Sequence, residues 1–445
     1  MKPDKPPKTY RVKSFGCQMN VYDGERMGEL LDEQGLAAAP DGEDADLVVL
    51  NTCHIREKAA EKIYSDIGRL TKGKTQKKAP MIAVAGCVAQ AEGEEIMNRA
   101  PAVSMVVGPQ AYHRLPDMLD KAVQGERATD TDMPAIAKFG ALPARKRRSP
   151  SAFLTVQEGC DKFCTYCVVP YTRGAEISRP FGDLIAEAQR LIEAGAREIT
   201  LLGQNVNAWA GEDTKGHKVG LAGLILALDK LDGLERIRYT TSHPNDMEDA
   251  LIAAHGEVEK LMPYLHLPVQ SGNDRVLKAM NRAHTAESYL KLLDRFREAR
   301  PDIALSGDFI VGFPGETEAE FEDTLSLVDE VRYSQAFSFK YSPRPGTPAA
   351  SMEGQFSREV MDDRLQRLQA RLNRDQHAFN HALVGQSCKV LVERKGKLPG
   401  QWLGKSPWLT SVWFADEKGG EAAIGDLVEV DMIEAGPNSI EGTLR

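Results

Sequence analysis

Three cysteines, Cys160, Cys164 and Cys167, lie in the middle of the chain with three and two residues between them. This spacing puts three thiolates on one short loop, a pattern typical of metal binding in a reducing compartment. Structural zinc usually takes four ligands, and the remaining candidates, His54 and Cys388, are remote in the sequence. Three thiolates on a four-iron cluster would leave one iron open to another ligand. The spacing therefore favours an iron–sulfur cluster over zinc.

A second set of three cysteines is spread over the first hundred residues. Cys17, Cys53 and Cys87 each follow a short apolar run, reading YRVKSFG, LVVLNT and MIAVAG. Buried core cysteines are common, and that interpretation has about half the weight when these three are taken alone. The repeated order of strand and then cysteine shifts the balance, because the carboxyl ends of parallel strands meet at one edge. We therefore expect a second cluster there, again with an open iron.

The first segment must supply the strands that position those cysteines. Apolar runs alternate with stretches of helical composition, around 27–34 and 57–70. Such alternation predicts βαβ units and a parallel sheet. We expect an N-terminal parallel α/β sheet domain over residues 1–137.

A new series of strands and helices begins at Ser151 and continues to about Ser342. Six β/α repeats are too few for a closed eight-strand barrel, so the pattern predicts a partial, open (β/α)6 barrel with its chemistry at the strand carboxyl ends. A long amphipathic helix over 358–383 completes a core of residues 151–383. The candidate strands are 153–157, 198–203, 236–240, 264–269, 303–311 and 336–340.

The two ends of this core differ in composition. After Gly385, short alternating strands separated by Gly and Pro predict a small antiparallel β-barrel over 384–445. Before the core, residues 138–150 contain no acid and are expected to form a basic linker. Its basic residues are Lys138, Arg145, Lys146, Arg147 and Arg148.

The composition of the chain limits its environment and partners. The 445 residues carry a net charge of −9, so any nucleic-acid site must be a local basic patch. No apolar stretch approaches the length of a membrane span, and residues 1–10 lack the apolar region of a signal peptide. We therefore expect a cytoplasmic protein without a membrane partner.

The loop 160–167 resembles the cluster motif of the radical S-adenosylmethionine (SAM) superfamily, with the aromatic Tyr166 before its last cysteine and a strand before the loop. Two further stretches, SFGCQMN at 14–20 and YSPRPGT at 341–347, extend the resemblance to the methylthiotransferase family. That resemblance covers nearly the whole chain: a three-cysteine domain, a radical SAM core and a C-terminal TRAM domain.

Two stretches indicate one branch of that family. NTCHIREK at 51–58 and GQNVN at 203–207 are similar to the branch that acts on N6-(dimethylallyl)adenosine in tRNA. His54 departs from this pattern, because serine is the commoner residue at its position. The cysteines are unaffected by that departure.

The resemblance implies an enzyme with two 4Fe–4S clusters that uses SAM. One cluster, on Cys160, Cys164 and Cys167, would cleave SAM reductively, and the other would hold the sulfur that becomes the methylthio group. The implied substrate is tRNA with an isopentenylated adenosine at position 37, modified at C2. An electron donor such as flavodoxin or ferredoxin is implied, and we expect a monomer.

SAM itself would lie across the strand ends of the core. Polar side chains there would hold its ribose and methionine groups, and a glycine would let the backbone approach its adenine. Each such residue has near even odds of being a turn or cap residue instead. The stretch 312–317 lacks the Lys-Ser/Thr ending of a P-loop. The predicted SAM residues are Tyr166, Gln204, Asn205, Ser242, Gln270 and Gly312.

RNA contacts are expected from basic residues at two places. Arg173 and Arg179 follow the cluster loop and would face the SAM carboxylate, the second cluster or RNA phosphate, with ordinary ion pairs as the alternative. On the C-terminal barrel, basic residues interleave with tryptophans, which suits phosphate contact and base stacking. The predicted barrel residues are Lys389, Arg394, Lys395, Lys397 and Trp402.

Three other interpretations stay open. Sister methylthiotransferases act on threonylcarbamoyl-adenosine in tRNA or on an aspartate of a small-subunit ribosomal protein. A non-catalytic iron–sulfur RNA-binding protein is less compatible with the open-iron triad, because an electron carrier normally gives its cluster four ligands. A single-cluster radical methylase would leave Cys17, Cys53 and Cys87 as structural residues. Cys388 is expected to be a barrel-core cysteine.

Overall fold

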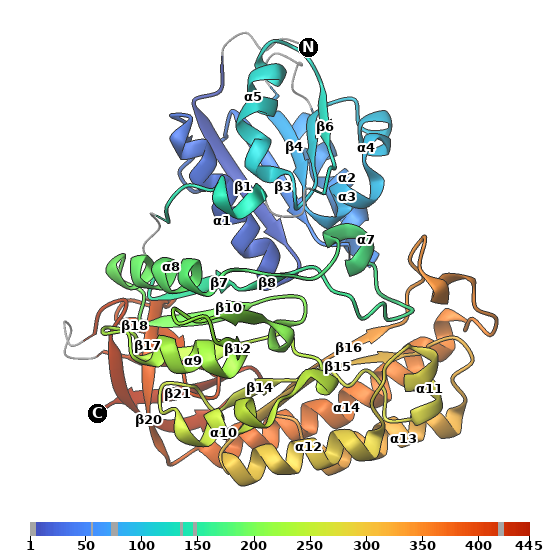
Figure 1. Ribbon diagram of the computed structural model, residues 1–445, viewed down its shortest axis with the longest axis vertical. Coiled ribbons are helices and arrows are strands. Elements are labelled where there is room, and N and C mark those ends of the chain that lie inside the picture. The colour runs from blue at the N-terminus through green and yellow to red at the C-terminus, as the bar shows by residue number, and fades with distance from the viewer. Residues whose placement is uncertain (1–5, 55–56, 73–78, 134–136, 146–148, 417–421) are drawn as a thin grey trace. The chain divides into compact units, whose positions relative to one another are not determined.

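The structure is a computed structural model that describes residues 6–54, 57–72, 79–133, 137–145, 149–416 and 422–445. Its chain divides into two compact units (Figure 1). Unit 1 comprises Met1–Lys146, Glu158–Asp161 and Cys167–Ile177, and unit 2 comprises the rest. Within the described ranges, no helix is long and apolar enough to cross a membrane. Lys146, Arg147 and Arg148 of the predicted basic linker lie outside the described residues.

Unit 1 is built on a six-stranded sheet in the order β2-β1-β3-β4-β5-β6, and every neighbouring pair in it is parallel. The predicted parallel α/β sheet domain is therefore confirmed. The three strands expected before the cysteines form its centre, and three strands were missed because they are short or have no cysteine after them. The strands are β1 Thr9–Phe15, β2 Ala37–Ala38, β3 Leu47–Thr52, β4 Met81–Ala85, β5 Val103–Val107 and β6 Ala128–Asp130.

Helices cover both faces of this sheet, because its central strands are apolar on both sides. Val49 and Ala83 point into one core with residues of α1 and α5, whereas Val48 and Val84 point into a second core with residues of α2, α3 and α4. The helices are α1 Gln18–Glu33, α2 Glu57–Thr71, α3 Cys87–Glu92, α4 Glu94–Arg99, α5 Leu115–Val123, α6 Ala137–Gly140 and α7 Val169–Arg173.

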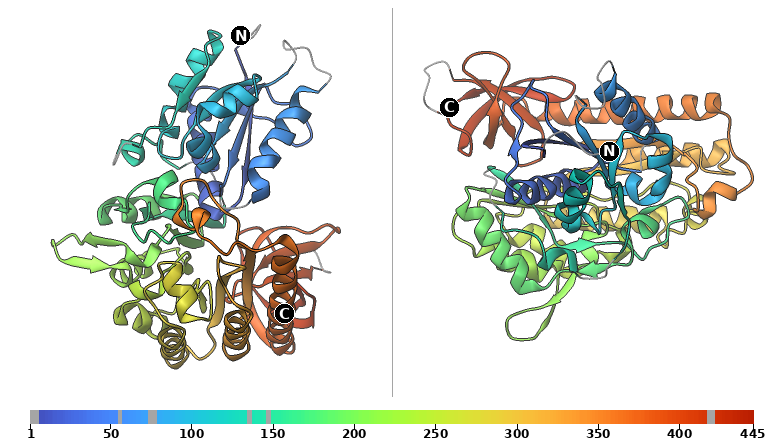
Figure 2. Two further views of the ribbon diagram at one scale, coloured as in Figure 1. Left: turned by 90° about the vertical axis from the view of Figure 1, so that its right-hand side faces the viewer. Right: turned by 90° about the horizontal axis from the view of Figure 1, so that it is seen from above.

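Unit 2 contains the predicted six-stranded, open β/α array. Its strands form two parallel groups, β13-β10-β7 and β14-β15-β16, joined by a bridge between Ile237 and Leu261. Figure 2 shows the helices packed along the outside of these strands. The strands are β7 Ser151–Thr155, β10 Glu198–Leu202, β13 Arg236–Tyr239, β14 Tyr264–His266, β15 Ala304–Val311 and β16 Gln335–Lys340. The helices are α8 Phe181–Glu193, α9 Leu221–Asp229, α10 Asp249–Glu257, α11 Asp274–Ala279, α12 Ala286–Ala299, α13 Glu318–Val331 and α14 Arg358–Leu383.

The C-terminal strands close into a barrel in the order β17-β18-β19-β21-β20. The predicted barrel is confirmed, with one correction: β19 and β21 pair parallel, so it is not wholly antiparallel. Cys388 lies in its core with Val390 and Phe414, as predicted. The strands are β17 Ser387–Lys395, β18 Gln401–Lys405, β19 Ser411–Ala415, β20 Leu427–Ala435 and β21 Ser439–Leu444.

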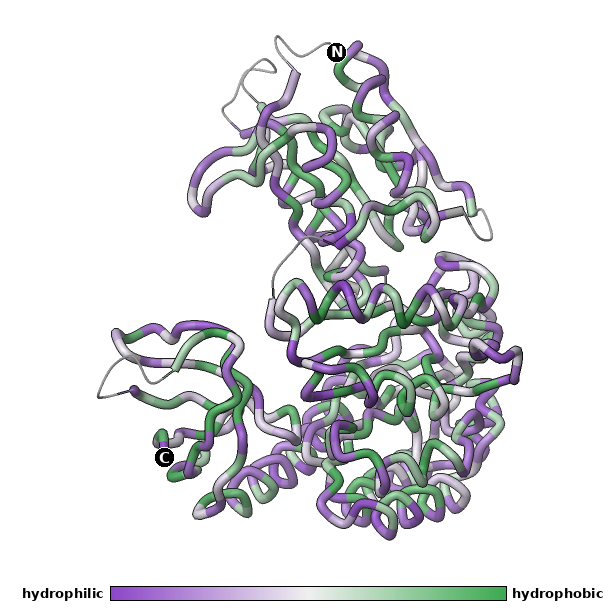
Figure 3. Tube along the Cα trace, turned by 60° about the vertical axis from the view of Figure 1, so that its left-hand side comes forward, coloured by the Kyte–Doolittle hydropathy of each residue, from purple (hydrophilic) through white to green (hydrophobic). Residues whose placement is uncertain are grey.

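The hydrophobic residues follow this division into strands and helices. In Figure 3 the coiled segments of the chain alternate between hydrophobic and hydrophilic residues along their length. The largest core gathers buried residues of the β/α array, among them Leu154, Ile237 and Phe309. Burial on both faces explains why these strands lack a two-residue alternation.

Candidate functional site

Cys17, Cys53 and Cys87 lie at the carboxyl edge of three neighbouring strands in unit 1. Cys17 caps α1 after β1, Cys53 follows β3, and Cys87 is the first residue of α3 after β4. Gly16 has φ +115°, and a Cβ there would overlap the Cβ of Cys53. Two of the three strand ends therefore approach closely because the residue before Cys17 has no side chain.

The electrostatics of this edge favour a thiolate at Cys17. A hydrogen bond with Cys53 and the positive charge of Arg173 outweigh burial and lower the pKa of Cys17 to about 6. Burial raises the pKa of Cys87, although Arg173 opposes that effect. Thiolates are the form that binds metals. These thiols are free of disulfides, so their chemistry suits an iron–sulfur cluster.

Two asparagines hold the backbone around these cysteines. Asn20 Nδ2 donates to the carbonyl oxygen of Phe15 at 2.9 Å, and Asn51 Nδ2 donates to that of Asn20 at 2.6 Å. Gly86, before Cys87, has φ +89°, and a Cβ there would overlap Asn51 Oδ1. Asn20 and Asn51 belong to the stretches that resemble the family, which gives those motif residues a structural reason.

Arg173 lies buried in unit 1 and is not exposed to RNA. Its Nη2 donates to Asp23 Oδ2 at 2.5 Å and to Asn20 Oδ1 at 3.3 Å, and its side chain is 2% exposed. The prediction that Arg173 contacts RNA is therefore wrong. The alternative prediction placed Arg173 beside the second cluster. In unit 1 its charge does act on Cys17 and Cys87 of that cysteine set.

Cys164 is a buried thiol in unit 2. Arg282 Nη1 donates to its Sγ at 3.8 Å. The loop around it is fixed by Asn281, whose Nδ2 donates to the carbonyl oxygens of Lys162 and Phe163 at 3.1 and 3.0 Å. Phe163 has φ +46°, an unusual conformation for a bulky residue that is held by these contacts.

Cys160 and Cys167 belong to unit 1 and are partly exposed. Cys160 N donates to the carbonyl oxygen of Gly174 at 3.2 Å, and Cys167 Sγ accepts from Val169 N at 3.4 Å. Gly159 has φ +76°, and a Cβ there would overlap the backbone of Ala175. The cysteine loop therefore needs glycine at its start.

Polar side chains follow β7, β10 and β13 in unit 2, and those after β10 and β13 include the predicted SAM residues Gln204, Asn205 and Ser242. Gln157 Oε1 accepts from the backbone N of Gln204 at 2.9 Å and of Asn205 at 3.0 Å. Asn205 Nδ2 donates to Asp246 Oδ2 at 2.7 Å. Ser242 Oγ is buried and has no hydrogen-bond partner among the described residues. An orphaned buried hydroxyl at a strand end fits a residue that awaits a polar ligand.

Gln270 and Gly312 follow β14 and β15, and both have positive φ, +77° and +70°. The side chain of Gln270 is buried, and its backbone pairs with Phe309 across an isolated bridge. Tyr166 is half-buried against a small apolar cluster that includes Phe313 and Tyr341. These positions are near the loops that end β14 and β15, where a ligand of an open α/β sheet binds.

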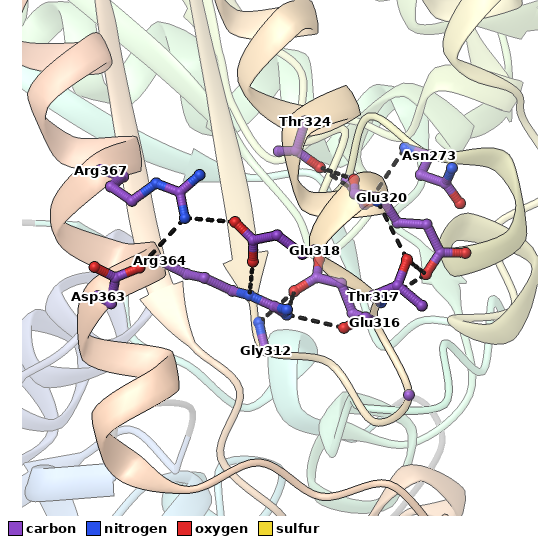
Figure 4. Close-up of polar contacts among 12 residues, drawn as sticks. Asn273, Gly312, Glu316, Thr317, Glu318, Glu320, Thr324, Asp363, Arg364 and Arg367 are labelled. Atoms are coloured by element: carbon purple, nitrogen blue, oxygen red, sulfur yellow. Dashed lines mark hydrogen bonds and ion pairs between the residues drawn. The ribbon is translucent and has the colours of Figure 1, made fainter.

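The loop after Gly312 is held by buried charge. Glu316 Oε2 accepts from Gly312 N at 2.7 Å and from Arg364 Nη1 of α14 at 2.8 Å (Figure 4). Thr317 then caps α13 in a reciprocal capping box with Glu320. The resemblance to a P-loop is therefore superficial, because Glu316 and a helix cap organise the turn.

The predicted RNA residues of the barrel lie on its surface. Lys389, Arg394, Lys395 and Lys397 are exposed, and Lys395 Nζ lies 5.9 Å from the ring centre of Trp402. Trp402 is partly buried against the barrel core. The structure brings these side chains to strand β17, the turn after it and strand β18.

The structure also corrects the prediction that Arg179 contacts RNA, and it buries two basic residues of the expected linker, Lys138 and Arg145. Arg179 is buried and donates to Glu187 Oε2 at 2.7 Å in unit 2. Lys138 and Arg145 of the predicted linker are buried ion pairs of unit 1: Lys138 contacts Glu158 at 2.5 Å, and Arg145 contacts Glu25 at 2.8 Å. Basic residues near Gly and Pro indicated exposure, but carboxylates distant in sequence bury these cations.

Several residues near these sites were missed in the sequence. Gln157, Asp246, Arg282 and Glu316 bind loop backbone or neighbouring side chains, and His243 and His284 pack their rings 6.0 Å apart. Burial lowers the pKa of His243 to about 2 and that of His284 to about 3, so both are neutral. Three of them carried a signal, because Gln157 ends the predicted strand 153–157 and His243 and Asp246 follow the predicted strand 236–240.

Within the described ranges, no three histidine, cysteine, aspartate or glutamate side chains are placed to share a single metal ion. His54 is half-buried next to Cys53.

An open six-stranded parallel β/α array with a C-x3-C-x2-C loop after its first strand defines a radical SAM protein. A model of the Radical SAM superfamily matches residues 154–328, and one of the Uncharacterized protein family UPF0004 matches residues 9–108.

The chain belongs to the family of tRNA-2-methylthio-N(6)-dimethylallyladenosine synthases. It is 79% identical over 444 residues to the protein of that name from Erythrobacter litoralis, covering 100% of this chain and 99% of that protein. The corresponding protein of Novosphingobium aromaticivorans is 75% identical, with 98% of each chain covered.

Solved structures support the fold at low sequence identity. A radical S-adenosylmethionine methyltransferase, TsrM from Kitasatospora setae, solved with cobalamin and a 4Fe–4S cluster bound, gives a TM-score of 0.55 at 12% identity. The match covers 77% of this chain and 74% of that chain. A cobalamin-dependent S-adenosylmethionine radical enzyme, OxsB, gives 0.52 at 13% identity over 82% of this chain and 56% of that chain.

Proposed function

We propose that the protein methylthiolates C2 of N6-(dimethylallyl)adenosine at position 37 of tRNA, using SAM and two 4Fe–4S clusters. The observation that carries this proposal is the presence of two separate cysteine triads, one at the sheet edge of unit 1 and one in the C-x3-C-x2-C loop. A single-cluster methylase needs only the second of them. Relatives that share the whole length of the chain carry the name of this activity.

The two triads have different tasks in this proposal. When bound, the clusters and SAM supply the radical chemistry and the sulfur that an unactivated aromatic carbon requires. Cys160, Cys164 and Cys167 hold one cluster and leave an iron open for SAM. Cys17, Cys53 and Cys87 hold the other, and the low pKa of Cys17 keeps that ligand ionised at neutral pH.

The strand-end residues of unit 2 bind and orient SAM. Gln157 fixes the backbone of Gln204 and Asn205, so that their polar groups face the ligand in one conformation. Ser242 supplies its free hydroxyl, and the backbone at Gly312 and Gln270 meets the adenine where β15 and β14 end. Tyr166, which packs against the apolar cluster of Phe313 and Tyr341, contributes an aromatic ring to this site.

The partners follow from the same proposal. The tRNA binds to the barrel through Lys389, Arg394, Lys395 and Lys397, and Trp402 stacks on a base. A low-potential donor such as flavodoxin or ferredoxin supplies electrons, and the protein acts as a monomer in the cytoplasm. We retain the division into residues 1–137, 138–150, 151–383 and 384–445 as part of this proposal.

Counting iron and sulfide tests the two-cluster proposal. The protein is purified without oxygen and reconstituted, alongside a Cys17→Ala/Cys53→Ala/Cys87→Ala variant and a Cys388→Ala control. We expect about eight irons in the parent and control and about four in the triple variant, because each cluster holds four. About four irons in all three proteins would leave a single-cluster enzyme and end the proposal.

Product analysis tests the substrate. The reconstituted protein is incubated with SAM, a reductant and tRNA that carries either N6-(dimethylallyl)adenosine or threonylcarbamoyl-adenosine. The masses of the product nucleosides are then measured by mass spectrometry. We expect the methylthio product from the first tRNA only. Product from the second alone would assign the chain to a sister activity.

A further inference from the structure

The guanidinium of Arg173 is a buried cation with a defined place beside the cysteines of unit 1. It ends α7, only six residues after Cys167, and the backbone oxygen of Arg173 accepts from Gln110 Nε2 at 3.0 Å. Asn20 Oδ1 accepts from Arg173 Nη2 at 3.3 Å and from Cys17 Sγ at 3.8 Å, and the charge of Arg173 acts to lower the pKa of both Cys17 and Cys87. An ion pair with Asp23 alone would not require Arg173 to lie beside two thiols.

The hydrogen bonds of Arg173 are incomplete. Its Nη2 is satisfied by Asp23 and Asn20, but its Nη1 is buried and has no hydrogen-bond partner among the described residues. Glu158 lies 3.6 Å from Nη1, which is an ion-pair distance beyond hydrogen-bond reach. A buried charged donor without a partner is costly, so a group that accepts from it would be bound favourably.

Arg173 belongs to a buried network with as many carboxylates as cations, so an anion would be bound there by direct contact with Arg173 and not by excess positive charge. Lys138 and Arg173 are balanced by Glu158 and Asp23 in one buried network, in which Lys138 contacts Glu158 at 2.5 Å. Thiolate ligands and a further sulfur anion would add negative charge to a site that is removed from water. Coulomb attraction to Arg173 is strong there, because few water molecules screen it.

We propose that Arg173 binds the anionic sulfur that completes the Cys17/Cys53/Cys87 site, with its free Nη1–H donating to that sulfur. This rests on the proposed function, because it assumes a cluster with an open iron on those cysteines. The segment directly behind the C-x3-C-x2-C loop thereby contributes a ligand-binding residue to the other triad.

The test isolates the second site in the full-length chain. In a Cys160→Ala/Cys164→Ala/Cys167→Ala background, only the Cys17/Cys53/Cys87 cluster remains. Arg173→Met and Arg173→Lys are made in this background, with Arg179→Met as the control because it removes another buried arginine from an ion pair, in unit 2. Iron content, the cluster's reduction potential and its titration with methanethiolate, followed by electron paramagnetic resonance, are compared.

We expect Arg173→Met to bind methanethiolate at least about tenfold more weakly, as for the loss of one charge-assisted hydrogen bond, and to have a more negative reduction potential. Arg173→Lys should restore the reduction potential but not the affinity for methanethiolate. The lysine ammonium keeps the positive charge but lacks the planar set of guanidinium N–H donors. Arg179→Met should match the background. Unchanged affinity and potential in an iron-loaded Arg173→Met protein would overturn the proposal.

Loss of iron from the variants is also decisive. If Arg173→Met and Arg173→Lys lose the cluster while the metal-free proteins melt like the background, Arg173 acts on the cluster site and the proposal is supported. If the metal-free proteins are unfolded, Arg173 is structural and the proposal is wrong. A background protein that never holds a cluster would refute the proposed function itself, and the role of Arg173 with it.

Discussion

At the scale of single residues, Cys17 combines partial exposure with a thiol pKa lowered to about 6. The hydrogen bond with Cys53 is the largest cause, and the charge of Arg173 adds to it. Cys87 is buried and its pKa is raised. Two cysteines of one proposed cluster site therefore differ in reactivity before any iron binds, because one is stabilised as a thiolate and the other is desolvated.

This difference predicts selective alkylation. In the metal-free protein, Cys17 should react with iodoacetamide with half-maximal rate near pH 6, because a lowered pKa makes the thiolate dominant above that pH. Cys87 should stay unmodified at pH 7. Peptide mass spectrometry across pH 5 to 9 measures both rates. An Arg173→Met variant should move the Cys17 midpoint upward, and equal rates at both cysteines would contradict the assignment.

At the scale of elements, α14 fastens the loop after β15. Arg364 contacts Glu316 at 2.8 Å and also donates to its backbone oxygen at 2.9 Å, and both side chains are almost fully buried. Burial raises the pKa of Glu316, although Arg364 and Gly312 N oppose that effect. The long helix therefore acts on the conformation of Gly312 through one carboxylate.

Removing Arg364 should affect both stability and SAM binding. Arg364→Met leaves Glu316 buried without its cation, so the free energy of unfolding should fall by about 3–5 kcal/mol. Affinity for SAM should fall too, because the Gly312 turn is released. Denaturant titration and equilibrium binding measure the two effects. Arg367→Met removes a more exposed cation of the same helix, paired with Glu318 at 2.6 Å, and should cost less than about 1 kcal/mol.

The barrel is fastened to the β/α array by two arginines of β13. Arg238 donates to Glu198 and to the carbonyl oxygens of Ser406 and Pro407 at 2.8–2.9 Å. Arg236 donates to those of Lys405 and Lys389 at 2.8 and 2.6 Å. Backbone carbonyls of the proposed RNA face are therefore held directly by the array.

We expect Arg238→Met to loosen the barrel before the rest of unit 2. Three hydrogen bonds are lost, and Glu198 keeps Ser151 Oγ as a donor at 3.1 Å and Arg236 as a cation at 3.9 Å. Amide hydrogen exchange in strands β17 to β19 should accelerate, while strands of the sheet in unit 1 keep their protection. The matched control is Arg295→Met, which breaks an exposed pair with Asp249. Equal acceleration in both variants would show that the Arg238 contacts do not hold the barrel.

At the scale of the whole molecule, a net charge of −9 makes RNA binding depend on where the cations lie. Many arginines already form ion pairs with carboxylates of the protein. Examples along α14 are Arg364, Arg367 and Arg374. The exposed cations of β17 and of the turn after it differ from those of α14, because an aromatic ring, Trp402, is among their neighbours. This face is the one we expect to meet phosphate.

Neutralising that face should weaken tRNA binding and its salt dependence. With Lys389, Arg394, Lys395 and Lys397 all changed to Gln, the slope of log K against log salt should fall by up to about 3, at about 0.7 per phosphate contact. Filter binding at several salt concentrations measures it. A control with the same charge change at the exposed Lys215, Lys218, Lys230 and Lys278 should keep the slope. Identical slopes in all three proteins would exclude this face.

The sequence by itself determined the architecture, and it was enough to propose the two cysteine triads. Strand runs that end in Cys17 and Cys53 are local patterns, and so is the short spacing of the loop 160–167, which needs no tertiary information. The C-terminal barrel and its core cysteine, Cys388, were also predictable, because short strands of alternating apolar and polar residues are separated there by Gly and Pro. These features are encoded by residues close together along the chain, so they can be recognised without the tertiary structure.

Only the tertiary structure decided which charges are buried. Arg173, Arg179 and Lys138 looked like surface cations, yet their partners Asp23, Glu187 and Glu158 bury them as ion pairs. Two of these partners lie 20 and 150 residues away, so no local pattern could indicate the pairing. A charge enters the interior only where a distant opposite charge offsets its desolvation, and that balance is a property of the folded chain.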